Sequence, residues 1–184
     1  DIATGLGSKR ELDAFLEHMD APAVDPATLL LAHTPAHVQA LAALAEELDR
    51  EEADGRAAHR HVDPDTSMNA HSWEAALHAA GAAVAATDAV MAGQLANAFC
   101  AVRPPGHHAC RNEAMGFCLF NNVAVAALHA LHHHGLQRVA IVDFDVHHGN
   151  GTEDIVAGDA RILMASFYQH PFYPYGGARS QASN

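Results

Sequence analysis

Apolar residues recur at helical spacing in three stretches of the chain. The first stretch follows Thr34-Pro35, a pair typical of a helix start. Its apolar face is formed by Val38, Leu41, Leu44, Ala45 and Leu48. The second begins at Ser72, which can cap a helix, and ends near Gly93, and the third spans residues 123–131. The spacing predicts three helices that each bury one face against a core.

Short apolar runs without helical spacing occupy residues 97–102, 138–144 and 161–167. The last two are rich in β-branched residues, and all three predict buried strands. Residues 49–65 are polar and contain chain breakers, so they predict an exposed connection. Alternating strands and helices are typical of a parallel sheet covered on both faces, which places the chain in the α/β class.

The composition narrows the class of protein further. A chain of 184 residues with 49% hydrophobic and 17% charged residues is typical of one globular domain. A net charge of −12 with ten Lys and Arg argues against direct nucleic-acid binding, because neutralising phosphates requires clustered cations. No apolar stretch approaches the ~20 residues of a membrane span. Three cysteines fit neither a zinc motif nor a disulfide framework, so we expect a cytoplasmic protein.

Histidine is unusually abundant, with sixteen residues, and this invites a search for metal sites. His129 and the run His132–His134 could form a metal-binding tract. They lie at the end of the third predicted helix, just before Gly135. A solvated cationic helix end, favoured by the helix dipole, is the interpretation that we prefer for this tract.

The candidate metal ligands follow the second predicted strand. In Asp145-Val146-His147, residues two apart project to the same side of an extended segment. One carboxylate and one imidazole can then face one Zn²⁺, whose catalytic sites have three protein ligands and one open position. An isolated D-x-H would more simply satisfy loop backbone groups. Asp143 changes this interpretation, because a carboxylate buried by the strand requires a partner or a cation.

A histidine doublet follows the first predicted strand, and strand ends on one side of a parallel sheet form its ligand crevice. Pro104-Pro105-Gly106 presents His107 and His108, whose rings are useful only if different partners hold them. Asp143 is the candidate partner of His107, and Asn150 is the candidate partner of His108.

A four-residue segment, 115–118, precedes the third predicted helix and contains Gly116 and Phe117. Glycine at position 116 allows close approach to a ligand, and Phe117 could wall an apolar channel. Taken alone, the segment would be a turn followed by a core residue.

Three motifs together, RPPGHHA (103–109), MGFCLFNN (115–122) and VDFDVHHGNGTEDI (142–155), closely resemble the zinc-dependent histone deacetylase family. The resemblance is to its class II and bacterial class-II-like branch, and it extends to DPDT (63–66), AAG (79–81) and HPFYP (170–174). GFC in place of GYC favours the deacetylase branch over acetylpolyamine amidohydrolases. The implied fold is a three-layer α/β/α parallel sheet of the arginase/deacetylase type, present only in part.

The resemblance also implies roles for individual residues. Asp145 and His147 would bind zinc, His108 would be the general base and acid, and His107 with Asp143 would be its electrostatic partner. The substrate contacts would be Gly116, Phe117 and Tyr173. A structural potassium ion would use Asp143, Ser166, Phe167 and the main chain around Asp145 and His147.

The implied reaction is hydrolysis of acetyl-lysine or a related N-acetylated amine, with zinc as the Lewis acid. Two alternatives stay open: an acetylpolyamine amidohydrolase, and a catalytically silent chain that binds acyl-lysine or a protein partner. A manganese hydrolase of the arginase type is disfavoured, because such a site needs more carboxylates in the D-x-H loop.

Several features of the family are missing from the sequence. A third zinc-binding aspartate, an oxyanion-stabilising tyrosine and an early HPE-type segment do not occur. Tyr168, Tyr173 and Tyr175 lie in the wrong segment for that tyrosine. We therefore expect residues 1–184 to form a partial catalytic domain that is inactive or nearly so by itself. An unpaired sheet edge would also allow a homo-oligomer.

Overall fold

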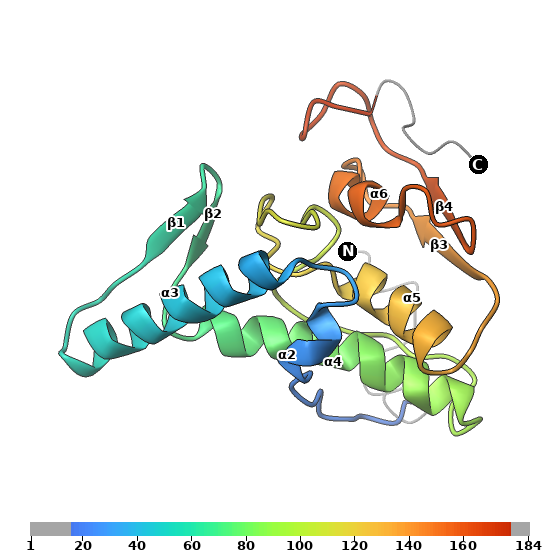
Figure 1. Ribbon diagram of the computed structural model, residues 1–184, viewed down its shortest axis with the longest axis horizontal. Helices are drawn as coiled ribbons and strands as arrows, with labels where there is room; N and C mark the ends of the chain where they lie inside the picture. Colours follow the sequence, from blue (N-terminus) through green and yellow to red (C-terminus); the bar gives the residue numbers. More distant parts are fainter. Residues whose placement is uncertain (1–15, 178–184) are drawn as a thin grey trace, which may run out of the picture.

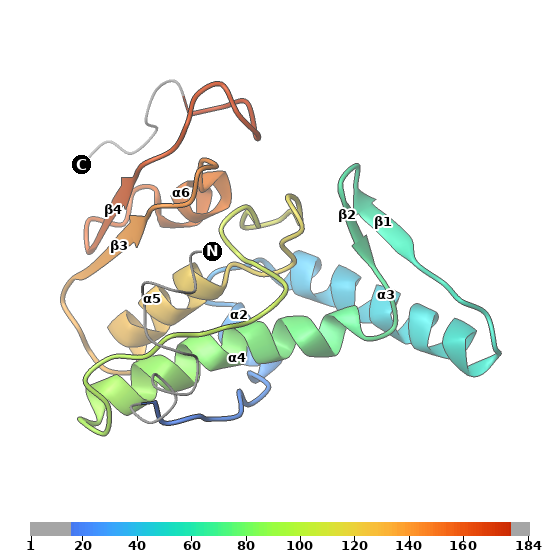
Figure 2. The same ribbon diagram turned by 180° about the vertical axis from the view of Figure 1, so that it is seen from behind.

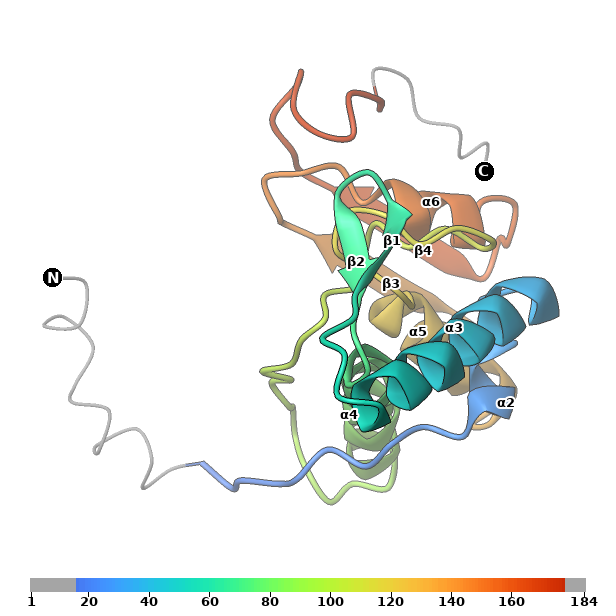
Figure 3. The same cartoon turned by 90° about the vertical axis from the view of Figure 1, so that its left-hand side faces the viewer.

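The computed structural model describes residues 16–177, which form a layer of helices beside a small parallel sheet (Figure 1). A separate antiparallel hairpin stands near one end of the helices, as Figures 2 and 3 also show. In chain order the elements are α2 (Pro26–Leu29), α3 (Pro35–Ala53), β1 (Arg60–Asp63), β2 (Thr66–Met68), α4 (Ser72–Met91), α5 (Asn122–His132), β3 (Val139–Asp143), α6 (Asn150–Val156) and β4 (Ile162–Ser166).

Helices α3 and α4 occupy the stretches with helical spacing. Thr34 begins α3 by accepting a hydrogen bond from the His37 amide, and the predicted apolar face is buried. The predicted cap of α4 is wrong by one residue. Ser72 is already helical, and its hydroxyl bonds with Asn69 instead of capping the helix. The Ser72 hydroxyl is therefore hydrogen-bonded within the loop before α4 and does not cap the helix.

Helix α5 begins at a buried asparagine that the sequence analysis did not single out. The Asn121 side chain accepts from the Ala124 amide at 3.1 Å and so caps the helix. Its amide nitrogen donates to Ala109 O at 3.0 Å and to Thr152 Oγ1 at 3.1 Å. One buried side chain therefore connects the start of α5 to the loop after the histidine doublet and to α6.

Buried histidines also belong to the core. His33 accepts a hydrogen bond from the Asn121 amide at Nε2 and contacts Cys110 O through Nδ1 at 3.0 Å. Burial and the nearby His37 lower the pKa of His33 to about 4, so this ring is neutral at pH 7. His37 packs edge-on against Phe120, which also contacts Trp73. His33 and His37 are therefore part of the packed core and are not metal-site candidates.

Strands β3 and β4 are parallel, in register from Val139 opposite Ile162 to Asp143 opposite Ser166, and α6 lies between them in the chain. Both predicted strands are confirmed. The first predicted strand, residues 97–102, is wrong. This segment forms no strand, and Phe99 is 92% exposed. A strand requires a neighbour for its amides and carbonyls, and none pairs with this run among residues 16–177.

The expected exposed connection at residues 49–65 is also wrong in part. Helix α3 continues to Ala53, and β1 then pairs with β2, with Arg60 opposite Met68. The burial of Thr66 and Met68 anchors this hairpin. Polar composition hid the strands, although β1 is half-buried apart from the exposed His61. Within the described part of the chain, no helix is both long and apolar enough to cross a membrane.

A methyl group at position 81 would test the close packing of α4. Gly81 lies so near the segment before α2 that a Cβ atom would be 1.9 Å from Pro22 O and 2.8 Å from Val24 N. Helix propensity alone predicts that Gly81→Ala stabilises the protein by about 1 kcal/mol. We expect it instead to lower the free energy of unfolding by about 1–3 kcal/mol through overpacking.

Urea unfolding of Gly81→Ala beside Ala85→Gly provides the measurement. Ala85 is a half-buried α4 position, where removing the methyl should cost about 1 kcal/mol by propensity. Both variants should therefore be less stable than the parent. A stabilised Gly81→Ala would contradict the close approach.

Candidate active site

The histidine doublet lies between two polar partners. His107 Nδ1 is 2.9 Å from Asp143 Oδ2, and His108 Nδ1 is 2.8 Å from Asn150 Oδ1. The ring centroids of the two histidines are 4.0 Å apart. The structure therefore brings together both pairs that the sequence predicted. One ring is backed by a carboxylate and the other by a neutral amide.

The charges of these pairs follow from burial and hydrogen bonding. Burial raises the pKa of the Asp143 carboxyl, but hydrogen bonds from His107 and the Asp145 amide outweigh it and hold the pKa below its usual value. Burial lowers the pKa of His108, and the Asn150 hydrogen bond offsets only part of this. Asn150 Oδ1 can only accept, so His108 Nδ1 carries a proton and Nε2 retains its lone pair. His108 is thus a neutral base with its free nitrogen facing away from Asn150.

Asp145 and His147 present one oxygen and one nitrogen to the same point. Asp145 Oδ1 lies 3.0 Å from His147 Nδ1 and accepts from the His147 amide at 2.8 Å. The two side chains are 50% and 41% exposed. This mixed donor pair fits Zn²⁺. Among residues 16–177, the one group of three or more side chains that could hold a metal lies elsewhere, so Asp145 and His147 form a pair here without a third such side chain.

A second set of oxygen atoms lies at the end of the parallel sheet. Ser166 is opposite Asp143 in the strand register, and its buried hydroxyl has no hydrogen-bond partner in the described residues. Phe167 donates its amide to Asp143 O at 2.9 Å. An orphaned hydroxyl beside a carboxylate fits a hard cation that takes oxygen ligands. The predicted potassium residues are therefore neighbours in space.

The hairpin tip holds the loop of Gly116 and Phe117. Gly116 donates its amide to Asp65 Oδ1 at 3.1 Å, and Phe117 donates to Thr66 Oγ1 at 2.9 Å. Both loop residues have positive φ angles, 58° and 65°. The Phe117 side chain is 63% exposed. The hairpin therefore holds the loop in which Gly116 lies against the His108 ring and Phe117 is exposed, a role that the sequence analysis did not assign to Asp65 and Thr66.

Tyr173 completes the aromatic surroundings of His108. The two ring centroids are 4.9 Å apart and the rings are perpendicular. Burial, and then the negative charge of Asp65, raise the pKa of the Tyr173 hydroxyl above its ordinary value, so it remains protonated. Burial raises the pKa of the Cys118 thiol to about 12, which makes it a packing residue and not a nucleophile.

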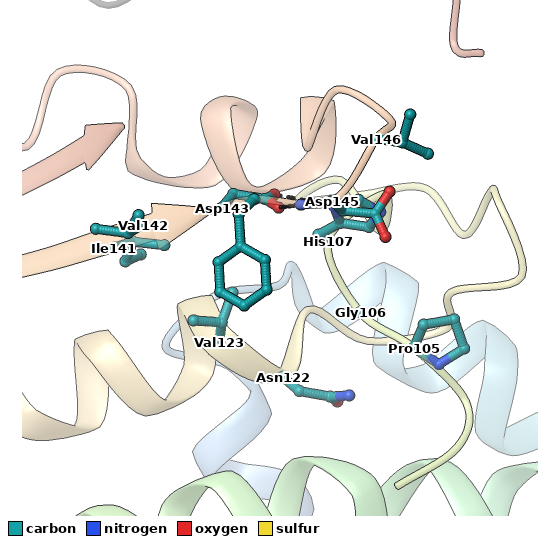
Figure 4. Close-up of a pocket in the computed structure, with 11 residues that line it drawn as sticks. Pro105, Gly106, His107, Asn122, Val123, Ile141, Val142, Asp143, Asp145 and Val146 are labelled. Carbon is teal, nitrogen blue, oxygen red and sulfur yellow. Dashed lines mark hydrogen bonds and ion pairs between the residues drawn. The ribbon is translucent and has the colours of Figure 1, made fainter. Parts of the chain in front are cut away.

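A hollow of about 580 Å³ lies behind the His107–Asp143 pair, between the start of α5 and the end of β3. Figure 4 shows Asp143 and His107 pointing toward each other, with Asp145 beside them and Val146 turned away. Asn122 and Val123 line the hollow from α5. Asp143, the partner of His107, therefore also lines this hollow.

Comparison with known proteins identifies the family. The histone deacetylase domain matches residues 2–184. The chain belongs to the histone deacetylase family. A histone deacetylase-like amidohydrolase of Pseudomonas aeruginosa is 41% identical over 169 residues, which cover 91% of this chain and 42% of that protein. The polyamine deacetylase HDAC10 of Rattus norvegicus is 43% identical over 157 residues, or 80% of this chain and 26% of that protein.

The fold agrees with this family. The crystal structure of the HDA15 HD domain superposes with a TM-score of 0.81 at 39% identity, over 90% of this chain and 46% of that chain. The predicted α/β arrangement of the arginase/deacetylase type, present in part, is therefore confirmed. The chain spans less than half the length of each of these three proteins.

A methyl group at position 116 would test how closely the loop approaches His108. A Cβ on Gly116 would lie 2.4 Å from His108 Cδ2, in a backbone conformation that disfavours side chains. Gly116→Ala should displace the imidazole and shift its ring resonances in an NMR spectrum. Gly55→Ala is the matched control, because Gly55 also has a positive φ but no atom within 4 Å. Unchanged His108 resonances in Gly116→Ala would contradict the contact.

Proposed function

We propose that this chain provides part of the catalytic domain of a zinc-dependent amidohydrolase that removes acetyl groups from acetyl-lysine or a related N-acetylated amine. One observation supports the proposal above others. Two histidines with different partners lie beside an aspartate and a histidine whose ligand atoms are 3.0 Å apart. This arrangement combines a proton carrier with metal ligands, which is what hydrolysis of an unactivated amide requires.

Asp145 and His147 are the residues that would hold zinc. When bound, zinc supplies Lewis acidity that polarises the acetyl carbonyl and acidifies water. No side-chain nucleophile is then needed, in agreement with the buried, protonated Cys118. Asp143, Ser166 and Phe167, with the main chain around Asp145 and His147, would hold a structural potassium ion.

His108 carries the proton in the proposed reaction. Its Nε2 accepts a proton from the attacking water and returns it to the nitrogen of the leaving amine. Asn150 keeps the proton on Nδ1 and fixes the orientation of the ring. His107, backed by the Asp143 carboxylate, lies 4.0 Å away and provides an electrostatic partner for the proton transfer.

Gly116, Phe117 and Tyr173 would contact the acyl-lysine chain. The ring of Tyr173 lies near His108, and the exposed Phe117 follows Gly116, which lies against His108, so an aliphatic lysine stem could pass along apolar surfaces here. We place acetyl-lysine in proteins ahead of small acetylated amines as the substrate. The printed name of the HDAC10 relative makes acetylated polyamines the second substrate to assay.

Two ligands make a weaker site than the three of a catalytic zinc, and an oxyanion donor alone is worth about 10²–10³ in rate. We therefore propose that residues 1–184 in isolation are inactive or nearly so.

The three cysteines form no disulfide, which agrees with a reducing cytoplasm as the proposed compartment.

Replacing His108 tests the proton carrier in the full-length protein. His108→Ala should lower kcat/KM for an acetyl-lysine peptide by about 10²–10⁴, the usual contribution of general acid–base catalysis, while zinc stays bound. The exposed His71→Ala is the control and should retain full activity. Unchanged turnover in His108→Ala would exclude the assigned role. Zinc binding without turnover in the parent, on either acetyl-lysine or acetylpolyamine substrates, would indicate a silent binder.

Replacing Asp145 tests the ligand assignment. Asp145→Asn should reduce the zinc content of purified full-length protein, because a neutral amide is a poorer zinc ligand than a carboxylate. Asp49→Asn removes an exposed carboxylate of α3 and should leave the zinc content unchanged. Metal analysis that finds equal zinc in both variants would refute Asp145 as a ligand.

A further inference from the structure

A second group of metal-ligating side chains lies away from the active site. Asp88, His129, His133 and His134 offer four ligand atoms that all lie within 4.8 Å of one another. They come from the C-terminal ends of α4 and α5 and from the residues just after α5. Figures 1 and 2 show these two helix ends side by side, apart from the loops that hold the active-site pairs.

The local structure explains the convergence. His129 and His133 are four residues apart, so they share one face at the end of α5. Their rings stack with centroids 4.8 Å apart and 12° between planes. His134 follows directly, and its ring meets those of His129 and His133 edge-on, with centroids 5.4 Å and 5.0 Å away. Asp88 lies in the last turn of α4, the helix that packs on α5.

One carboxylate oxygen is the centre of the group. Asp88 Oδ1 lies 2.7 Å from His129 Nε2 and 2.6 Å from His134 Nε2. His129 is buried, whereas His132 and His133 are exposed, so only part of this end of α5 is solvated as the sequence suggested. Two imidazoles that approach a single oxygen, with a third ring beside them, offer their nitrogen atoms to one small volume.

The electrostatic setting favours a cation. Both helices direct their C-terminal ends, which carry partial negative charge, toward this volume. Asp88 adds a carboxylate to this volume, in contact with the His129 and His134 rings.

We propose that Asp88, His129, His133 and His134 form a second, structural zinc site that joins the ends of α4 and α5. Three imidazole nitrogens and one carboxylate oxygen suit Zn²⁺ and similar transition-metal ions, whereas Mg²⁺ and Ca²⁺ take oxygen ligands. Four protein ligands also complete a tetrahedral zinc site, which leaves no position for catalysis. The ion connects two helices that otherwise meet through apolar packing and hydrogen bonds.

The test uses tag-free, full-length protein carrying Asp145→Asn and His147→Ala, which removes the proposed catalytic ligands. We expect one equivalent of Zn²⁺ to bind this protein, and Co²⁺ to give the visible absorption of a tetrahedral complex. Adding His129→Ala should weaken zinc binding by at least ~10–100-fold, because losing even a residue that only hydrogen-bonds a metal ligand has an effect of this size. Adding His132→Ala should leave binding unchanged, because His132 is exposed and outside the group.

A second variant shows whether zinc binding is lost because a ligand is removed or because the protein unfolds. Asp88→Asn keeps the shape and a hydrogen-bond acceptor but removes the charge, so it should weaken zinc binding with an unchanged circular dichroism spectrum. Zinc should also raise the Tm of the His132→Ala protein but not that of the Asp88→Asn protein. Absence of zinc binding in the starting variant, or equal binding by all variants, would overturn the second site. Neither result depends on deacetylase turnover, so failure of the proposed function is distinguishable.

Discussion

The buried amide of Asn121 determines how the active-site segments meet. Its oxygen caps α5, while its nitrogen donates to Ala109 O and Thr152 Oγ1. Thr152 in turn donates its amide to the carbonyl of His107 at 3.1 Å. An unpaired buried amide would cost about 1–3 kcal/mol for each lost partner, so these segments are coupled through one side chain. The doublet, α5 and α6 therefore take their relative positions together.

The features that the sequence predicted well are those set by local pattern. Helical spacing located α3, α4 and α5, and apolar β-branched runs located β3 and β4. The pairs of His107 with Asp143 and of His108 with Asn150 were predicted correctly, but the reasoning behind them was wrong in part, because residues 97–102 before the doublet form no strand. Their roles in catalysis stay predictions.

The features that the sequence did not predict depend on partners distant in the chain. Residues 97–102 have the composition of a strand, but a strand exists only where another strand accepts its hydrogen bonds. The hairpin was missed because its polar residues are specified by contacts with the Gly116 loop. The contact of Asp88 with His129 was missed for the same reason, since the two residues lie 41 positions apart.

The hairpin positions the loop of Gly116 and Phe117 independently of the histidine doublet and the Asp145–His147 pair. Asp65 and Thr66 accept the hydrogen bonds that shape the loop that displays Phe117, while His108 and the Asp145–His147 pair lie on other segments with their own hydrogen bonds. Changes in the length or tilt of the hairpin could thus alter which side chains reach His108 and leave the reacting groups in place. The hairpin and the His107–His108 segment are therefore positioned by separate sets of hydrogen bonds.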